Sequence, residues 1–234
     1  MPVVPPHQHH RHIPHDVHDT RPIDSSEKEI KSFEKHINSL HSLMIQKGHL
    51  PSMDPIRRAA EEVDGMFATQ NLAANVPEFL RERWPEYSER RVLAVEIVLC
   101  ELGYLTADEL QRGQTDPPLH PDPVAYVPSL DEETYKDACY ALGDRVQIRS
   151  EATPGHIRTP VYLLGKQGRI ANIQGHFPNP EDIAHFQSPV LALPLYLVEF
   201  DMVEIWGAAC PARSRHDKLR AEIYEPWLIK ISPA

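Results

Sequence analysis

Histidine and cysteine are the residue types in this chain best suited to metal chemistry, and neither is arranged as a fixed ligand set. Four histidines near the start are closely spaced and could bind a transition metal: His7, His9, His10 and His12. A flexible cluster of this kind binds metal adventitiously more often than it forms a catalytic centre, which needs fixed geometry and supporting hydrogen bonds. The three cysteines are far apart and include no Cys-x-x-Cys pair: Cys100, Cys139 and Cys210. We therefore interpret them as small, buried, reduced thiols and expect no metal site in this chain.

Arg158 is a better candidate for a functional role. It ends the run Gly-His-Ile-Arg, next to His156, and the glycine of that run permits close approach of the backbone to a neighbour. An arginine side chain is planar, always charged and donates two fixed hydrogen bonds. Arg57 and Arg58 instead fall in a helical pattern, where an arginine usually faces solvent. No serine–histidine–aspartate set, phosphate loop or pair of carboxylates in the sequence provides an alternative active site.

Composition excludes several classes of protein. The 234 residues are enough to bury a core in one large domain or two small ones. The formal net charge of −10 and the pI of about 5.7 argue against a nucleic-acid-binding surface, which would be basic. No apolar run reaches the length of a membrane span, and the Pro/His-rich start does not resemble a secretory signal. We therefore expect a soluble, cytoplasmic protein.

The elements that position the candidate residues are helices in the first half of the chain. Residues 26–48 carry apolar side chains at helical spacing. Ser26 and Glu29 form a potential capping pair at the start of this segment, and Gly48 stands where a helix commonly stops. The pattern predicts one helix across these residues.

Two further helices follow. Residues 54–65 begin with Asp54 and a proline in the first turn, which is typical of a helix start. Residues 86–103 have apolar side chains on most helical faces, which predicts deep burial, and Thr106 with Glu109 begins another capped turn. The first half is therefore predicted to be a small helical domain.

The pattern changes after a proline-rich stretch. Residues 113–130 contain five prolines, which block regular ladders and favour an extended linker. Several short segments beyond residue 137 alternate apolar and polar side chains between glycine turns, which predicts a small, strongly bent β-barrel. Residues 1–24, rich in proline and histidine, cannot form their own core and are predicted to be an arm.

Three stretches of the second half resemble the C-terminal SH3-like barrel of nitrile hydratase β subunits. They are GDRVQIRS (143–150), PGHIRTPVYLLGKQGRI (154–170), and the runs YLVEF, EIWG and EIYEPWL within 196–228. In the helical half, YSERRVLAVE (87–96) and ELGYLTADEL (101–110) are similar to the N-terminal domain of the same subunit. PHDV near the start and the later EKE also resemble a subunit of thiocyanate hydrolase, a close relative.

This resemblance implies an α+β fold in which an N-terminal helical domain is followed by a C-terminal SH3-like small β-barrel. The implied organisation is an arm (1–24), a helical domain (25–112), a Pro-rich linker (113–136) and the barrel (137–234). It also implies a heteromer whose α-type partner holds non-corrin cobalt or non-haem iron in a cluster of partly oxidised cysteines. This chain lacks such a cluster, so it is interpreted as the β-type subunit, with no cofactor of its own.

The resemblance also implies roles for individual residues. Arg158 and Arg57 correspond to two arginines that clamp the partner's oxidised cysteines, although Arg58 is possible in place of Arg57. Tyr87 corresponds to a tyrosine that lines the substrate pocket and donates a hydrogen bond near the metal, and His156 is also placed in this pocket. Arg91 stands where nitrile hydratases commonly carry a pocket tryptophan. We expect it either to face the pocket or to pair with Glu86 or Glu89 on the surface.

The substrate and the class of function stay open at this point. A nitrile hydratase would hydrate a nitrile to an amide, whereas the cationic Arg91 favours a small anion such as thiocyanate. That second hypothesis is a thiocyanate hydrolase with its two small non-metal subunits fused. A third is an accessory metallochaperone for the metal subunit, although such homologues tend to resemble the helical domain alone. A fourth, an SH3-like peptide-binding module, would need an exposed aromatic groove.

Overall fold

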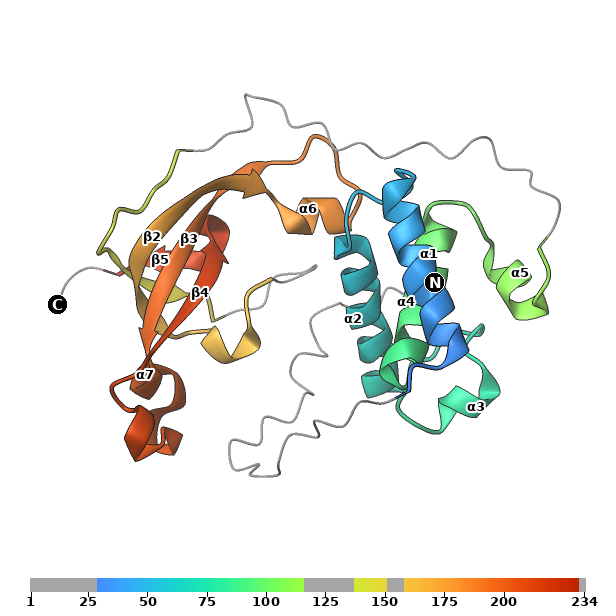
Figure 1. The fold of residues 1–234 in the computed structure, drawn as a ribbon, viewed down its shortest axis with the longest axis horizontal. Helices are drawn as coiled ribbons and strands as arrows, with labels where there is room; N and C mark the ends of the chain where they lie inside the picture. Colours follow the sequence, from blue (N-terminus) through green and yellow to red (C-terminus); the bar gives the residue numbers. More distant parts are fainter. Residues whose placement is uncertain (1–28, 116–136, 151–157, 232–234) are drawn as a thin grey trace. The chain divides into compact units, whose positions relative to one another are not determined.

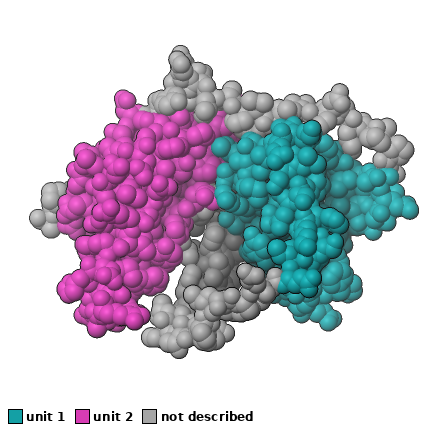
Figure 2. Space-filling model, in the orientation of Figure 1, with its two compact units in different colours: residues 1–128, 154–156, 183–186 teal, residues 129–153, 157–182, 187–234 magenta. Residues whose placement is uncertain are grey.

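The computed structural model of the chain describes residues 29–115, 137–150 and 158–231 (Figure 1). These residues divide into two compact units, coloured separately in Figure 2. Within the described ranges, unit 1 comprises residues 29–115 and 183–186, and unit 2 comprises residues 137–150, 158–182 and 187–231. Unit 1 is helical and unit 2 is built on an antiparallel sheet, which confirms the predicted α+β class. The predicted arm and nearly all of the predicted linker lie outside the described residues.

Residues 29–115 of unit 1 form five helices. They are α1 (Ser32–Gln46), α2 (Asp54–Thr69), α3 (Glu78–Arg81), α4 (Tyr87–Glu101) and α5 (Ala107–Arg112). None of the described helices has the length and apolar character that crossing a membrane requires. The capped start of α5 is as predicted, since the Thr106 hydroxyl accepts from the backbone N–H of Glu109.

Two helix boundaries differ from the prediction. Helix α1 begins at Ser32, and its first turn is closed by Glu34, which accepts from the backbone N–H of Lys31 at 2.7 Å. The predicted partner Glu29 lies before the helix. Helix α2 continues through Gly65 to Thr69 and ends at Gln70, which adopts a left-handed conformation (φ 54°).

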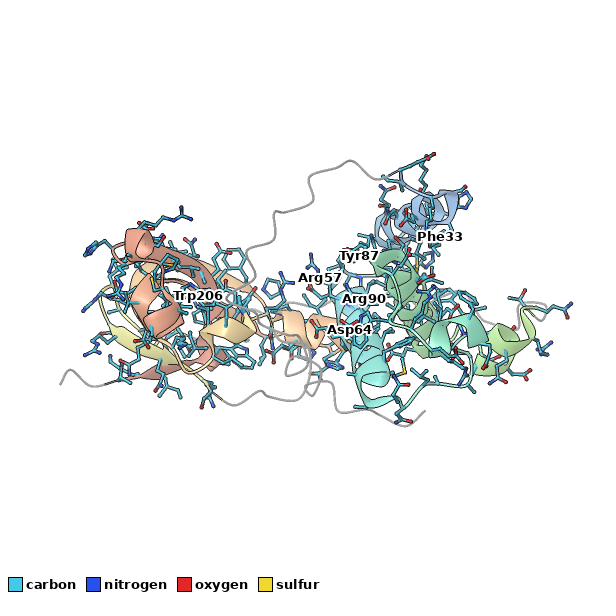
Figure 3. All side chains as sticks on the ribbon, turned by 90° about the horizontal axis from the view of Figure 1, so that it is seen from below. Phe33, Arg57, Asp64, Tyr87, Arg90 and Trp206 are labelled. Carbon is cyan, nitrogen blue, oxygen red and sulfur yellow. The ribbon has the colours of Figure 1, made fainter. Side chains whose placement is uncertain are left out.

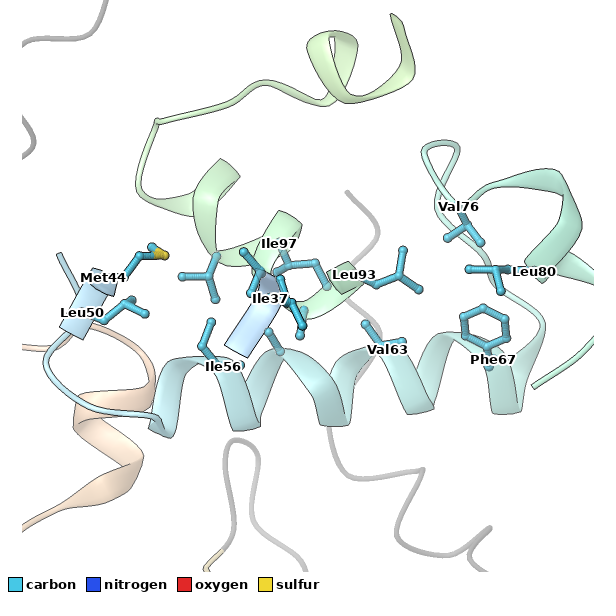
Figure 4. Close-up of a cluster of buried hydrophobic side chains, with 14 residues drawn as sticks. Ile37, Met44, Leu50, Ile56, Val63, Phe67, Val76, Leu80, Leu93 and Ile97 are labelled. Atoms are coloured by element: carbon cyan, nitrogen blue, oxygen red, sulfur yellow. The ribbon is translucent and has the colours of Figure 1, made fainter. Parts of the chain in front are cut away.

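The core of unit 1 lies mainly between α2 and α4, with contributions from α1 and α3 (Figure 4). Phe67, in the last turn of α2, is 2 % exposed and packs in the same cluster as Leu80 of α3. Burial of this aromatic ring stabilises the extra turn of α2 by roughly 2 kcal/mol, more than the cost of one helical glycine. Tertiary packing therefore outweighs the local tendency of Gly65 to end the helix.

Unit 2 is a five-stranded antiparallel sheet in the order β4-β3-β2-β1-β5. The strands are β1 (Arg145–Ile148), β2 (Gln167–Pro178), β3 (Ala192–Asp201), β4 (Lys218–Tyr224) and β5 (Leu228–Lys230). Strands β4 and β5 form the two edges, so the sheet is not closed among the described residues and the predicted barrel is not confirmed. Strand β2 contains two register shifts against β3, which bend it.

Short helical turns connect these strands. They are α6 (Pro180–Ala184), α7 (Met202–Trp206) and the 3-10 turns Val161–Leu163, Gly207–Ala209, Ala212–Ser214 and Glu225–Trp227. Gly168 allows β2 to approach β3 closely, because a Cβ atom there would lie 2.7 Å from Cγ1 of Val198.

A hydrogen-bonded tyrosine fixes the core of unit 2. The Tyr196 side chain is fully buried, and its hydroxyl donates to Glu225 at 2.6 Å while accepting from the backbone N–H of Tyr140 at 3.3 Å. Trp227 is also buried, and its indole N–H donates to Glu181 at 2.8 Å. Trp206 packs against this core but is only partly buried.

Candidate functional site

Tyr87, the first residue of α4, lies close to two guanidinium groups. The guanidinium carbon of Arg90 is 5.4 Å from the ring centroid, and that of Arg91 is 5.7 Å from it. Each contact is within the range of a cation–π interaction, worth about 0.5–1 kcal/mol at an exposed site. The tyrosine is 66 % exposed, so its hydroxyl is available to another molecule while the ring is held (Figure 3).

Asp64 of α2 orients the first of these arginines. Nη1 of Arg90 donates to both carboxylate oxygens of Asp64, at 2.8 and 3.1 Å (Figure 3). This ion pair joins α2 to α4 and is partly buried, so it restrains the guanidinium more than a fully exposed pair would. The position of Tyr87 therefore depends on a residue of a different helix.

Arg91 is held by neutral acceptors. Its guanidinium donates to the side-chain oxygen of Asn38 and to Nδ1 of His41, both on α1. Every other described arginine of unit 1 is paired with a carboxylate: Arg57 with Asp54, Arg58 with Glu62 and Glu101, Arg81 with Glu78, Arg83 with Glu89, Arg90 with Asp64, and Arg112 with Asp108. Among the described residues, Arg91 forms no ion pair with a carboxylate, and its guanidinium lies next to Tyr87.

One of the two sequence predictions about Arg91 is resolved by these contacts. The predicted surface pairing with Glu86 or Glu89 is wrong, because Glu86 pairs with Lys31 and Glu89 pairs with Arg83. The alternative, that Arg91 faces a substrate pocket, stays a prediction.

His41 is a neutral residue in this arrangement. It is 1 % exposed, and burial together with the charge of Arg91 lowers its pKa from 6.5 to about 4. Because a guanidinium only donates, Nδ1 of His41 accepts and the proton of the neutral ring is on Nε2. Nε2 is buried and has no hydrogen-bond partner among the described residues. No sequence motif indicated this role of His41, since Asn38 and His41 precede Arg91 by 53 and 50 residues.

The lowered pKa of His41 predicts a specific loss of stability in acid. A histidine whose folded pKa lies below its unfolded value stabilises the fold above pH 6.5, and that contribution is lost as the pH falls to about 4. As the pH falls from 6.5 to about 4, we expect the unfolding free energy of the wild type to fall by about 2–3 kcal/mol more than that of the His41→Gln variant. Urea denaturation at several pH values would measure the difference. His36→Gln, on the exposed side of α1, should follow the wild type, and equal slopes for all three proteins would contradict the prediction.

The two neighbouring arginines of α2 have different environments. Arg57 is half exposed and makes an ion pair with Asp54, one turn earlier, at 3.3 Å. The Arg58 side chain is 4 % exposed and donates to Glu62 at 2.6 Å, to Glu101 and to the carbonyl oxygen of Ala184 at 2.9 Å. Arg58 is therefore a structural residue of unit 1, whereas Arg57 presents its guanidinium to solvent (Figure 3).

Arg158 belongs to unit 2 and is exposed. It is followed by the buried Thr159 and by the 3-10 turn Val161–Leu163, in which the Tyr162 ring stacks on Trp206 with centroids 5.6 Å apart. The predicted pocket residue His156 lies outside the described residues. The structure thus brings Tyr87, Arg90 and Arg91 together within unit 1, and it describes Arg158 within unit 2.

A metal ion has no evident ligand set in the described part of the chain. No three histidine, cysteine or acidic side chains lie close enough together there to hold one. The predicted burial of the cysteines is correct for Cys210, whereas Cys100 is half-buried and Cys139 is exposed.

Comparisons with known proteins agree with the sequence pattern. Residues 129–230 match the family model described as nitrile hydratase beta subunit, C-terminal. The resemblance to nitrile hydratase β subunits is confirmed. The matched residues contain Arg158 and all five strands of unit 2.

Three nitrile hydratase β subunits illustrate how far this similarity extends. The chain is 29% identical to that of Pseudomonas chlororaphis over 161 residues, which are 68% of this chain and 65% of the relative. It is 34% identical to that of Rhodococcus erythropolis over 125 residues (52% and 57%), and 31% identical to the low-molecular weight cobalt-containing nitrile hydratase subunit beta of Rhodococcus rhodochrous over 150 residues (55% and 63%). The aligned parts thus span 57% to 65% of these relatives.

The similarity to nitrile hydratase β subunits also reaches the helical unit. The family model matches 102 residues (129 to 230), whereas the alignment with the P. chlororaphis subunit covers 161, so it must include residues before 129. Among solved structures, recombinant apo-thiocyanate hydrolase from Thiobacillus thioparus matches 42% of this chain and 80% of its own, with 26% identity and a TM-score of 0.39.

Proposed function

We propose that this chain is the non-metal, β-type subunit of a heteromeric nitrile hydratase-like enzyme, a cytoplasmic lyase that hydrates a nitrile to an amide. The observation that carries the proposal is the family match over residues 129–230, which includes the Gly-His-Ile-Arg run. In this proposal unit 2 is an SH3-like barrel, and the earlier division into arm, helical domain, linker and barrel holds. The partner α-type subunit holds cobalt or iron in a cysteine cluster, and that metal supplies Lewis-acid activation when bound.

The contribution proposed for this chain is a pair of arginines that donate to the partner's oxidised cysteines. Sulfinate and sulfenate oxygens are anionic acceptors, and at a buried interface they need charged donors. Arg158 is exposed in unit 2, and Arg57 is half exposed with one ion pair in unit 1. Arg58 is unsuited to this role, because its guanidinium is committed to two carboxylates and a carbonyl. We therefore choose Arg57 as the second clamp.

Tyr87 is proposed to donate its hydroxyl hydrogen bond to the substrate. Arg90 and Arg91 both contact the ring, so the hydroxyl needs less further ordering when a substrate arrives. His156 is proposed to lie in the same pocket. These residues bind and orient the substrate, and they exclude water from it.

Co-expression with the partner tests this proposal. A neighbouring gene whose product contains a tight Cys-x-x-Cys-x-Cys cluster should form a stable complex with this chain. We expect that complex to contain cobalt or iron and to convert a nitrile to its amide. A neighbouring product without such a cluster, together with failure of this chain to copurify with either metal, would contradict the proposal.

A second candidate, thiocyanate hydrolase activity, is supported by the charge of Arg91, which forms no ion pair with a carboxylate among the described residues. A guanidinium held by neutral acceptors attracts a small anion, whereas the aromatic residue common in nitrile hydratases gives an apolar wall. In this alternative the chain is a fusion of the two small non-metal subunits.

The Arg91→Trp variant distinguishes the two substrates. We expect its kcat/KM for thiocyanate to fall at least about tenfold, while that for an uncharged organic nitrile stays unchanged or rises. Steady-state kinetics of the reconstituted heteromer would measure both values. Arg112→Trp, on the exposed α5, is the matched control and should change neither. An unchanged ratio for Arg91→Trp would place Arg91 outside the pocket.

A further inference from the structure

An apolar groove runs between α1, α3 and α4 in unit 1. It has a volume of about 250 Å³ and is lined mainly by apolar side chains, among them Phe33, Phe79 and Val92. Pockets that bind small organic ligands usually have 300–1,000 Å³. The groove is therefore of a size to take one or two side chains of another protein.

Two exposed aromatic side chains line this groove. Phe33 of α1 is 37 % exposed, and Phe79 of α3 is 68 % exposed. Large aromatic rings are enriched in protein interfaces, where they carry much of the binding energy. The exposure of these rings therefore indicates a surface that binds another macromolecule.

The two carboxylates that line the groove differ in their partners. Glu89 is satisfied, because it accepts from both terminal nitrogens of Arg83 at 2.7 and 2.8 Å and from the backbone N–H of Glu86. Glu96 accepts from the side-chain amide of Asn75 at 3.2 Å and pairs with no cation among the described residues. Burial raises the pKa of Glu96, which reflects the cost of keeping this carboxylate charged.

We propose that this groove docks a segment of the metal-holding partner subunit through an arginine or lysine. The apolar stem of that residue lies along Phe33 and Val92, and its cationic end pairs with Glu96. Basic side chains commonly bury their stems on apolar surfaces in this way, and arginine is among the residues that dominate interface energies. The inference rests on the proposed function for the identity of the partner, and it adds a docking site in unit 1 to the arginine clamp.

Binding of the purified partner subunit to variants of the full chain tests the groove. Glu96→Gln retains the shape and removes the charge, so we expect the Kd to rise about tenfold. Phe79→Ser should raise it at least about tenfold, because this ring is exposed and available to the partner. Two matched controls, Glu82→Gln and Phe177→Ser, change exposed residues outside the groove and should leave the Kd within about twofold of the wild type.

The stability of the free chain separates docking from a folding defect. Glu96→Gln removes a carboxylate that burial disfavours, so the unfolding midpoint of the isolated chain should be unchanged or higher at pH 7. Weaker binding with undiminished stability supports docking. If the partner binds wild type and Glu96→Gln equally well, the groove proposal is overturned and the proposed function stands. If the cysteine-cluster subunit does not bind the wild type, both fail.

Photo-crosslinking identifies what occupies the groove. A benzophenone amino acid in place of Phe79 should crosslink to a partner peptide that contains an arginine or lysine, whereas the same group in place of Phe177 should not give that product. A crosslink to a second copy of this chain, or to a partner peptide without a basic residue, would overturn the proposal.

Discussion

Arg58→Met is expected to lower the unfolding free energy by about 3 kcal/mol, the low end of the range for breaking a buried ion pair. The substitution leaves the carboxylate of Glu62 and the carbonyl oxygen of Ala184 without their donor in the interior of unit 1. The Glu62 side chain is 23 % exposed, so it bears most of the desolvation cost, whereas Glu101 is 39 % exposed and recovers hydration more readily. Urea denaturation at pH 7 measures the loss.

The deficit should depend on pH in a defined direction. Burial already raises the pKa of Glu62, and the charge of Arg58 opposes that rise. Without the arginine, the folded state favours protonated Glu62 still more, so the variant regains stability as the pH falls and loses it as the pH rises through that pKa. The deficit is therefore expected to be smaller at pH 5 than at pH 8.

Arg57→Met is the matched control, because it removes the adjacent arginine of the same helix. Its exposed ion pair with Asp54 at 3.3 Å contributes no more than about 0.5 kcal/mol. Combining Arg58→Met with Glu62→Met should recover part of the loss, since the more buried of the two carboxylates that pair with Arg58 is then removed. Equal stabilities of the two single variants would contradict the structural role of Arg58.

The different environments of Arg57 and Arg58 illustrate which structural features a sequence pattern can predict and which it cannot. Spacing of apolar residues was sufficient to predict α1, α2 and α4, because burial of one face recurs locally along the chain, whereas the short α3 was not predicted. It did not separate Arg57 from Arg58, since the carboxylate of Glu101 and the carbonyl of Ala184 come from distant segments. The same limit applies to Arg90 and Asp64, which are 26 residues apart.

The sequence pattern predicted the strands of the sheet better than it predicted whether the sheet closes into a barrel. Alternating residues and glycine turns identified the strand-rich half, because side chains alternate between the two faces of a strand. Pairing register and closure depend on features with a weak sequence signal, such as the two register shifts in β2. Among the candidate site residues, Tyr87 and Arg91 were predicted through family resemblance, whereas Asn38 and His41, which accept from Arg91, had no motif.

Arg158→Lys is expected to reduce kcat of the reconstituted heteromer by about 10²–10³-fold while the complex still assembles. This is the range measured when one preorganised hydrogen-bond donor is removed from an active site. Lysine keeps the positive charge but replaces the planar fork with a single flexible ammonium, so it cannot hold two oxygens in fixed positions. Because Arg158 is exposed in unit 2, the substitution should change the unfolding free energy of this chain by no more than about 0.5 kcal/mol.

Three measurements separate this role from a general effect of charge at the interface. Steady-state kinetics gives kcat, size-exclusion chromatography gives assembly, and mass spectrometry gives the oxidation state of the partner's cysteines. Arg213→Lys, an exposed arginine of the same unit, is the matched control and should retain full activity. If Arg158 clamps the oxidised cysteines, its loss changes kcat and the oxidation state together. Full activity of Arg158→Lys with an intact complex would mean that charge alone suffices at this position, and the clamp would then be assigned elsewhere.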